Sequence, residues 1–339
     1  MTVFELTKEL VNIPSVTGEE AAIAEFVVGH LRRHGFEISK QPVAERRKNI
    51  LATLSTKPRV ILCTHLDTVP PFIPADEDAD YIYGRGSCDA KGILAAMITA
   101  GIKLREMDVR DFGLLFLVGE ETDSIGAKRA NALNVNSDFI VVGEPTENKL
   151  GAGHKGLVAA RITAKGKAAH SAVQDMGESA INKLLDILET IRKTNWGEDA
   201  LLGPSRVNIG TIAGGMAHNV VPAEASAQIS IRNTVSSQSV LETLRTVIDG
   251  RAEIEIITRA EPQKLFTLPG FEQTVLPYGT DIPHLKNFGK PLLIGPGAIK
   301  VAHTPNECIS KKELSVAVEI YVKLVQKLFR EADQYLMAN

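Results

Sequence analysis

Histidine and acidic residues stand just beyond an apolar, strand-like run near the start of the chain. Residues 60–64 lead into His65 and Asp67, and an extended segment would turn both side chains to the same side. One imidazole nitrogen of His65 could then bind a metal ion while the Asp67 carboxylate held the other nitrogen. An ordinary strand end with polar residues in solvent would look the same, so this pair alone does not decide the matter.

The same placement of acids and imidazoles recurs along the chain. Glu120 and Glu121 follow apolar residues 114–118, Glu144 follows 140–142, His303 lies in the loop after 292–294, and Asp89 precedes a predicted helix at 91–106. In open α/β sheets, ligands bind at the carboxyl edge of the strands, so residues far apart in the sequence would meet there.

The chemistry of these residues predicts a metal centre. Two imidazoles with several carboxylates suit Zn²⁺, with Co²⁺ or Mn²⁺ as alternatives, better than Ca²⁺ or Mg²⁺, which prefer all-oxygen ligands. One imidazole and one carboxylate for each ion, with a third carboxylate shared between the ions, would make a two-metal site. The four positive charges of two divalent ions exceed the three negative charges of these carboxylates by one, which a bridging hydroxide would neutralise. Such a hydroxide is a strong nucleophile near neutral pH.

Strands alternating with helices must position these residues. The hydrophobic pattern predicts strands at residues 36–39, 49–54, 59–64, 111–118 and 138–142, and helices at 91–106 and 124–133. A further helix is expected after Thr17, which forms a capping box with Glu20, and Gly35 ends that helix. The alternation indicates an α/β sheet covered on both sides.

The pattern changes near Gly151. Between residues 157 and 258 we expect strand, helix, strand, strand, helix and strand, the order of a small α+β sandwich with an antiparallel sheet. A buried-type strand at 292–294 and a long helix at 311–336 follow. We therefore predict a discontinuous first domain, residues 1–153 and 264–339, with a second domain, residues 154–263, inserted into it.

Composition narrows the classes of protein. The 339 residues carry a formal net charge of -3, so no basic field favours nucleic acid as a partner. The apolar stretches are too short to span a membrane, and the N-terminal residues look like an amphipathic helix rather than a signal peptide. Three widely spaced cysteines, Cys63, Cys88 and Cys308, argue against a disulfide framework and favour a reducing cytoplasm.

Five motifs occur in the order found in the M20 metallopeptidase family: His65-Leu66-Asp67, Gly-Arg-Gly-Ser-Cys-Asp89-Ala-Lys-Gly, Glu120-Glu121, Gly-Glu144-Pro-Thr and His303-Thr-Pro-Asn-Glu. The chain resembles this family, which includes acetylornithine deacetylase, succinyl-diaminopimelate desuccinylase, aminoacylase and carboxypeptidase G, over nearly its whole length. The resemblance implies a zinc-exopeptidase-like catalytic domain, with helices on both faces of a twisted mixed sheet. It also implies that the insertion is a ferredoxin-like dimerisation or lid domain.

The resemblance assigns roles to the clustered residues. Two sets of ligands are implied: His65, Asp89 and Glu144 for one ion, and Asp89, Glu121 and His303 for the other. Asp67 would support His65, and a cis peptide bond is expected after Asp89. Glu120 would be the general acid/base that takes a proton from the bridging water and passes it to the leaving amine.

Further matches lie mostly in the inserted domain. By resemblance, His170 reaches the active site of a partner subunit and steadies an oxyanion, which implies a homodimer. The residues expected to bind substrate are Asn219, Arg232, Lys155, Gly279 and Thr280. An Arg suits a carboxylate because its planar fork donates two parallel hydrogen bonds. Lys155 stands where desuccinylases carry an Arg, which weakens the case for a second carboxylate on the substrate.

These expectations describe a two-metal amidohydrolase that removes an N-acyl group from an amino acid, similar to acetylornithine deacetylase of amino-acid biosynthesis. A dipeptidase or carboxypeptidase with the same core is the alternative, as is a desuccinylase, because the sequence does not shape the pocket that selects the substrate. A metal-stabilised homodimer that only binds its ligand is a third hypothesis, against which the intact Glu120 and ligand set argue.

Overall fold

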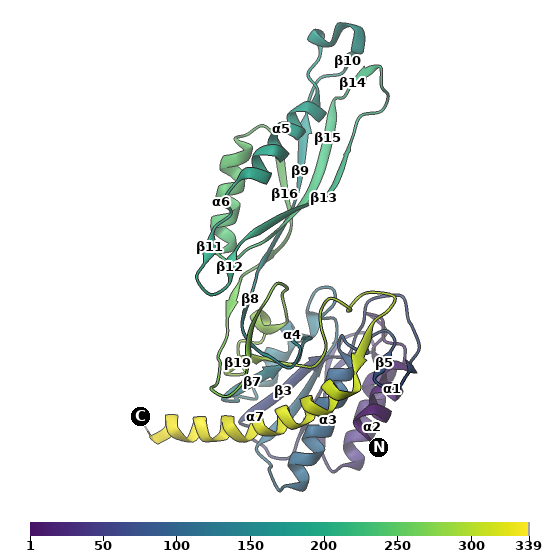
Figure 1. Cartoon of the computed structure of the whole chain (residues 1–339), viewed down its shortest axis with the longest axis vertical. Coiled ribbons are helices and arrows are strands. Elements are labelled where there is room, and N and C mark those ends of the chain that lie inside the picture. The colour runs from purple at the N-terminus through teal and green to yellow at the C-terminus, as the bar shows by residue number, and fades with distance from the viewer. Residues whose placement is uncertain (338–339) are drawn as a thin grey trace. The chain divides into compact units, whose positions relative to one another are not determined.

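A computed structural model describes residues 1–337 of the chain. The chain divides into two compact units (Figure 1). Unit 1 comprises Met1–Ala152, Leu265–Thr274 and Thr280–Asn339, and unit 2 comprises Gly153–Lys264 and Val275–Gly279. The predicted α/β class, with a mixed sheet, flanking helices and an α+β insertion, is confirmed.

Unit 1 is built on a six-stranded sheet in the order β1-β2-β6-β3-β7-β19. Its strands are β1 (Glu37–Ala44), β2 (Arg47–Thr53), β3 (Val60–His65), β6 (Phe112–Leu117), β7 (Phe139–Val142) and β19 (Lys290–Leu293). Strands β6, β3, β7 and β19 run parallel to their neighbours within that set, whereas β1 and β2 add an antiparallel edge. The carboxyl ends of the four parallel strands therefore lie along one edge of the sheet.

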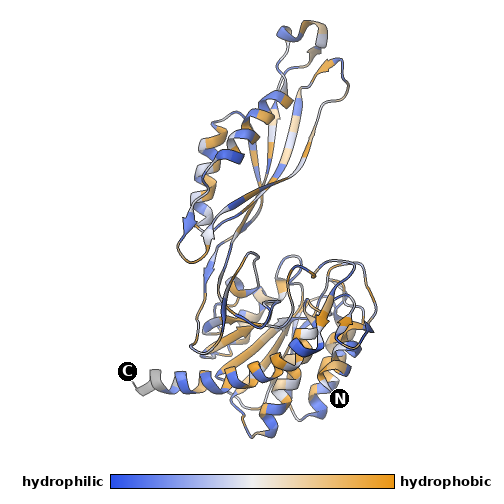
Figure 2. Cartoon of the chain, viewed as in Figure 1, coloured by the Kyte–Doolittle hydropathy of each residue, from blue (hydrophilic) through white to orange (hydrophobic). Residues whose placement is uncertain are grey.

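Helices cover this sheet because its central strands are apolar throughout. The helices of unit 1 are α1 (Val3–Val11), α2 (Ala21–Arg33), α3 (Lys91–Glu106), α4 (Ile125–Ala130) and α7 (Lys311–Met337), with 3-10 turns η1 (Asn131–Leu133) and η3 (Ile282–His284). Helix α3 packs on β3 and β6 and against α1 and α7, while α2 and α4 contact β1 and β2. All residues of β3 and β6 are buried, as expected for strands covered on both faces, and Figure 2 shows this sheet as largely hydrophobic.

Short strands complete unit 1 and lead the chain into unit 2. Strands β20 (Cys308–Ser310), β5 (Tyr81–Tyr83) and β4 (Asp76–Glu77) form one small antiparallel sheet. A second sheet has the order β17-β8-β18, with β8 (Leu150–His154), β17 (Gln263–Lys264) and β18 (Gln273–Leu276). In it the residues that begin and end the insertion pair directly, Gly153 with Lys264 and His154 with Gln263.

Unit 2 has its own core. Its four-stranded antiparallel sheet has the order β13-β15-β9-β16, with β9 (Leu157–Lys165), β13 (Arg206–Gly214), β15 (Glu224–Arg232) and β16 (Glu253–Ala260). Helices α5 (Ala180–Lys193) and α6 (Ser237–Ile248) pack on one face. The remaining elements are short: β10 (Ala169–His170), η2 (Ser171–Met176), β11 (Glu198–Asp199), β12 (Gly203–Pro204) and β14 (Val220–Val221). The alternation in β9 and β15 puts buried residues on the helical face and polar ones on the other.

One helix start differs from the prediction. Helix α2 begins at Ala21 after Glu20, and neither Thr17 nor Glu20 makes the capping-box hydrogen bonds. Glu20 is instead fully buried in a salt bridge with Arg47, 2.6 Å long, and Thr17 donates to Asp67. The predicted capping box was wrong because a cation and a carboxylate distant in sequence bind those two side chains. No helix within residues 1–337 combines the length and apolarity needed to cross a membrane.

Candidate metal centre

The predicted metal ligands of unit 1 and the predicted general acid/base Glu120 lie at strand ends and in loops at the carboxyl edge of its sheet. His65 is the last residue of β3, Glu120 and Glu121 lie just beyond β6, and Glu144 lies just beyond β7. Asp89 directly precedes α3, from the loop between β5 and that helix. The buried parallel strands thus end at the same edge of the sheet, and the polar residues that follow them lie close together there.

His65 is a fully enclosed imidazole between two acids. Its Nε2 lies 3.1 Å from Asp89 Oδ1, and its Nδ1 lies 3.0 Å from the backbone carbonyl oxygen of Asp67. The Asp67 carboxylate, which we expected to hold Nδ1, is farther away, with Oδ1 at 3.6 Å. Burial opposes protonation, but the hydrogen bonds with Asp67 and Asp89 raise the pKa of His65 well above its ordinary value.

The Asp67 carboxylate organises the loop that carries the two glutamates. Its Oδ1 accepts hydrogen bonds from the backbone amides of Gly119 and Glu120, at 3.0 and 3.1 Å. Its Oδ2 accepts from the Glu121 amide at 3.2 Å and from the Thr17 hydroxyl at 2.7 Å. Although burial opposes ionisation, these donors and His65 lower the pKa of Asp67. Asp67 therefore fixes both His65 and the Glu120-Glu121 turn.

Asp89 lies between the two histidines. Its Oδ1 faces His65, and its Oδ2 lies 3.4 Å from His303 Nε2. The expected cis peptide bond after Asp89 is confirmed at Asp89–Ala90. Burial opposes ionisation of Asp89, yet the two imidazoles lower its pKa well below the usual range. A carboxylate held between two imidazoles in this way can bridge two cations.

Glu121 and His303 form the outer part of the cluster. His303 Nε2 lies 3.0 Å from Glu121 Oε1, and the hydrogen bonds with Asp89 and Glu121 raise the pKa of His303 to about 10. The His303 side chain is 47% exposed, whereas that of Glu121 is 6% exposed. His303 adopts a φ of 61°, in the left-handed region that non-glycine residues rarely occupy, and such residues concentrate at binding sites.

Two further carboxyl groups lack hydrogen-bond donors. Burial, together with repulsion from neighbouring carboxylates, raises the pKa of both Glu120 and Glu144 well above the usual range. Glu144 is 5% exposed, and within residues 1–337 its carboxylate accepts no hydrogen bond. It lies close enough for its charge to interact with those of Asp89, Glu120 and His65.

This donor set fits divalent cations. One ligand atom each of His65, Asp89 and Glu121 lies within 4.8 Å of the others, and His303 and Glu144 adjoin this group. Five buried or half-buried carboxyl groups surround two imidazoles, an excess of negative charge that cations would offset. Nitrogen and oxygen donors together suit zinc, cobalt or manganese.

The structure adds a carboxyl group that sequence reasoning missed. Asp281 is 2% exposed, and its Oδ1 has no hydrogen-bond partner among the described residues. Burial raises its pKa to about 6, and its charge interacts with that of His65. The predicted substrate residues Gly279 and Thr280 directly precede Asp281, but nothing in the sequence shows that the Asp281 side chain turns inward.

The other predicted substrate residues are distributed over both units. Thr280 belongs to unit 1, is buried, and accepts a hydrogen bond from the Ile282 amide at 3.2 Å. Gly279 belongs to unit 2 and has open space where a side chain would stand. Lys155, in unit 2, donates to the Pro204 carbonyl oxygen at 2.6 Å. Its ammonium group is therefore already engaged.

His170, Asn219 and Arg232 lie in unit 2. His170 and Asn219 are exposed on the paired segments that contain β10 and β14, where the Ser171 amide donates to the Asn219 carbonyl oxygen. His170 Nδ1 accepts from the Ala172 amide at 3.1 Å. Arg232 ends β15 on the sheet face turned away from the helices, and burial lowers the pKa of its guanidinium group.

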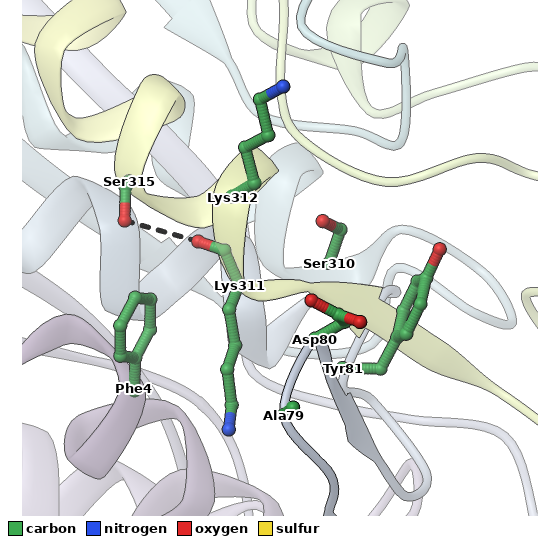
Figure 3. A pocket seen from close by; sticks show the side chains of 8 residues that line it. All are labelled: Phe4, Ala79, Asp80, Tyr81, Ser310, Lys311, Lys312 and Ser315. Carbon is green, nitrogen blue, oxygen red and sulfur yellow. Dashed lines mark hydrogen bonds between the residues drawn. The ribbon is translucent and has the colours of Figure 1, made fainter.

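A hollow elsewhere in unit 1 contains none of the predicted site residues (Figure 3). It is lined by Phe4 of α1, residues 79–81, and Ser310, Lys311, Lys312 and Ser315 around the start of α7. The Ser315 hydroxyl donates to the Lys311 carbonyl oxygen within the helix, as the dashed line shows. This hollow therefore has no part in the metal centre.

Comparison with known proteins adds independent findings. A model described as peptidase family M20/M25/M40 matches residues 61–327. A peptidase M20 domain-containing protein of Schizosaccharomyces pombe is 40% identical over 332 residues, covering 94% of this chain and 83% of that protein. A probable carboxypeptidase of Aspergillus fumigatus is 38% identical over 373 residues, covering 94% and 85%. A solved tripeptidase structure from Staphylococcus aureus shares the fold, with a TM-score of 0.82 and 23% identity over 97% of this chain and 98% of that one.

Proposed function

Because the chain belongs to peptidase family M20/M25/M40 and is a metal-dependent hydrolase of amide or peptide bonds, we propose that it removes the C-terminal residue from short peptides. The observation that supports hydrolysis by this site is the placement of Glu120. Its carboxyl group accepts no hydrogen bond within residues 1–337, and it stands beside a cluster of His65, Asp89 and Glu121. A carboxylate that binds no donor is available to move a proton.

A mechanism of hydrolysis follows from the positions of the side chains. His65, Asp89 and Glu144 would hold one divalent ion and Asp89, Glu121 and His303 the other, and the ions would polarise the scissile carbonyl and acidify water. Glu120 accepts a proton from the attacking water and returns it to the leaving amine. Asp67 keeps the Glu120 backbone in place through its hydrogen bond with the Glu120 amide. Zinc is the ion we propose, with cobalt or manganese as alternatives.

Arg232 supports the choice of a substrate that has a free carboxylate. Within residues 1–337 its guanidinium group makes no hydrogen bond or ion pair, although it is partly buried. A partly buried cation without a partner is costly, and a carboxylate forms two parallel hydrogen bonds with it. We propose that Arg232 binds the terminal carboxylate of the peptide. The name of the Aspergillus fumigatus relative, a probable carboxypeptidase, supports this choice.

We also propose that the enzyme acts as a homodimer, to which each subunit lends His170. His170 is exposed on unit 2, where a neighbouring subunit could approach it, and its Nδ1 accepts from the Ala172 amide. That bond leaves Nε2 to donate a hydrogen bond to a developing oxyanion. The three cysteines are free thiols, which agrees with the reducing cytoplasm that we propose as the location.

Removal of an N-acyl group from an amino acid, as by acetylornithine deacetylase, is a second candidate. Arg232 supports it equally, because the amino acid that is released also carries a carboxylate. The bond between Lys155 and the Pro204 carbonyl oxygen leaves less reason to expect a second carboxylate, as in a succinyl substrate.

A substrate panel separates these functions. It contains dipeptides and tripeptides with free or amidated C-termini, acetylornithine, acetylcitrulline and succinyl amino acids, each tested on zinc-loaded enzyme. A carboxypeptidase cleaves peptides with a free C-terminus, rejects amidated ones and is slow on the acetyl compounds.

Arg232→Gln should raise KM for peptides with a free C-terminus by about tenfold or more, since one bidentate pair is lost. Arg161→Gln, which breaks an ion pair with Glu255 on the same sheet, is the control. Equal cleavage of free and amidated peptides would contradict the proposal.

A further inference from the structure

A second buried glutamate lies directly behind the Asp89 loop. Glu307 is 1% exposed and stands four residues after His303, in the loop that precedes β20. Its Oε1 accepts hydrogen bonds from the backbone amides of Gly86, Cys88 and Asp89, at 3.0, 3.1 and 3.0 Å. A single carboxylate oxygen thus gathers three amides of one loop, the last of which belongs to the residue that faces both histidines.

The other oxygen of Glu307 binds a cation. Arg85 Nη1 lies 2.5 Å from Glu307 Oε2, and Arg85 is itself 2% exposed. The same guanidinium nitrogen donates to the Thr304 carbonyl oxygen at 3.3 Å, and the Gly84 amide donates to the Glu307 carbonyl oxygen at 3.0 Å. Hydrogen bonds therefore join residues 84–89 to residues 303–307 at several points along both segments. Each of these two segments carries one predicted metal ligand, Asp89 in the first and His303 in the second.

The conformation of the Asp89 loop depends on this carboxylate. Gly86 adopts a φ of +87°, and a Cβ there would stand 2.8 Å from Thr68 and 2.9 Å from Lys91, so a residue with a side chain would not fit this turn. Three amides that point inward need a buried acceptor, because unpaired buried donors are costly. Only an ionised carboxylate accepts from all three amides and from Arg85 together.

We propose that Glu307 is a positioning residue that sets the direction of the Asp89 carboxylate and links it to the His303 loop. It touches neither substrate nor metal, and it acts through the backbone of residues 86–89. The proposal rests on the metal-dependent function above, but it makes a claim about metal affinity that can fail while the peptidase assignment stands. Partners of this kind behind metal ligands typically contribute 10–100-fold to metal affinity.

The test compares Glu307→Gln with Arg85→Gln in the full chain. Metal-free protein is titrated with Zn²⁺ alone, and separately with Mn²⁺ alone, using a competing chelator, while circular dichroism checks that each variant is folded. Glu307→Gln should weaken metal binding 10–100-fold, because its side-chain amide accepts poorly from three donors and repels Arg85. Arg85→Gln removes the ion pair but leaves Oε1 on the amides, so metal affinity should stay within about threefold of the parent, although both variants melt at a lower temperature.

Glu261→Gln serves as the control. Glu261 Oε2 also accepts from one backbone amide, that of Ser237 at 2.9 Å, but in unit 2, which carries none of the predicted metal ligands. Unchanged metal affinity in Glu307→Gln overturns the proposal, as does an equal loss in both the Arg85 and Glu307 variants, which would indicate a general loss of stability. If Glu307→Gln does not fold, Glu307→Asp takes its place. The shorter carboxylate should weaken metal binding, and parental affinity would again overturn the inference.

Discussion

At the scale of single residues, one side-chain type performs several tasks because its surroundings differ. The Asp67 carboxylate accepts from four donors and stays ionised, and Asp89 is paired with two imidazoles. Glu120 and Glu144 have no donors, and burial raises their pKa values. Carboxylates with several hydrogen-bond donors thus organise the site, whereas carboxyl groups without donors are available to bind a cation or a proton.

The role of Glu120 gives the first prediction. Glu120→Gln should lower kcat by about 10²–10⁴-fold while the protein keeps its metal, because the amide cannot carry the proton. Glu121→Gln is the informative partner, since that side chain faces His303 and should lose metal together with activity. The measurements are steady-state kinetics and metal content per chain. Parallel loss of metal in both variants would make Glu120 a ligand instead.

A histidine far from the site gives a pH prediction. His30 on α2 is 4% exposed, its Nδ1 lacks a partner among the described residues, and burial and the charges of His34 and Arg33 lower its pKa to about 4. The unfolded chain, with a pKa near 6.5, therefore takes up this proton first, so stability falls as the pH drops from about 6.5 to 4.

The neutral variant His30→Gln should lose less stability over that range, by about 1–3 kcal/mol relative to the parent. Urea unfolding at pH 7 and pH 4 measures the difference. Equal losses in parent and variant would show that His30 does not contribute to the acid sensitivity.

The residue types of the site could be predicted from the sequence, but several of their partners could not. Acids and histidines after apolar strands indicate where metal ligands gather. Thr17, Asp281 and Glu307 act through residues that are 50 or more positions away or through inward rotation of a side chain. Local spacing contains no information on such contacts, and for this reason the spacing of Thr17 and Glu20 predicts a helix cap that does not form.

At the scale of elements, periodicity located the helices and strands better than their ends. The predicted helix at 91–106 is the observed α3, whereas residues 124–133 form a shorter α4 followed by a 3-10 turn. Strand positions were predictable because the buried sheet demands uninterrupted apolar runs. Helix ends depend on tertiary hydrogen bonds and are therefore less well specified by the local sequence.

The start of α3 gives an element-scale prediction. Gly92 lies in its first turn, and a Cβ there would stand 2.2 Å from the Ser87 carbonyl oxygen, a contact that backbone movement must relieve. Gly92→Ala should therefore displace residues 87–89 and weaken metal binding as well as stability. Chelator competition and thermal unfolding measure the two effects.

Gly29 in α2 is the matched control, because a Cβ there meets nothing closer than 3.8 Å. Gly29→Ala should raise the free energy of unfolding by about 0.5–1 kcal/mol, as alanine favours a helix, and leave metal affinity unchanged. If Gly92→Ala is equally stabilising, the loop is not held as tightly as described.

At the scale of the molecule, the metal centre draws its predicted ligands from unit 1 alone. Removal of metal with a chelator should abolish activity and lower the melting temperature, since bound ions would offset the repulsion among Asp89, Glu121 and Glu144. With free metal about 1,000-fold above Kd, the bound state gains about 4 kcal/mol. Differential scanning calorimetry with and without Zn²⁺ measures this shift, and an unchanged curve would contradict a resident metal.

The proposed dimer gives a prediction of complementation. A His170→Ala chain and a Glu120→Gln chain should each be nearly inactive, and a mixture refolded into verified heterodimers should regain part of the parental activity. One active site of each heterodimer would then combine an intact Glu120 with an intact His170. No recovery would mean that each chain uses its own His170.

The pairing of Gly153 with Lys264 puts the start and the end of the insertion on adjacent strands. A segment whose two junctions sit side by side can be exchanged between homologues by two cuts, with little disturbance to the host. Chimeras that keep the residues before 153 and after 264 and graft the corresponding insertion of a relative would then combine the selectivity of the donor with the hydrolytic machinery of the recipient.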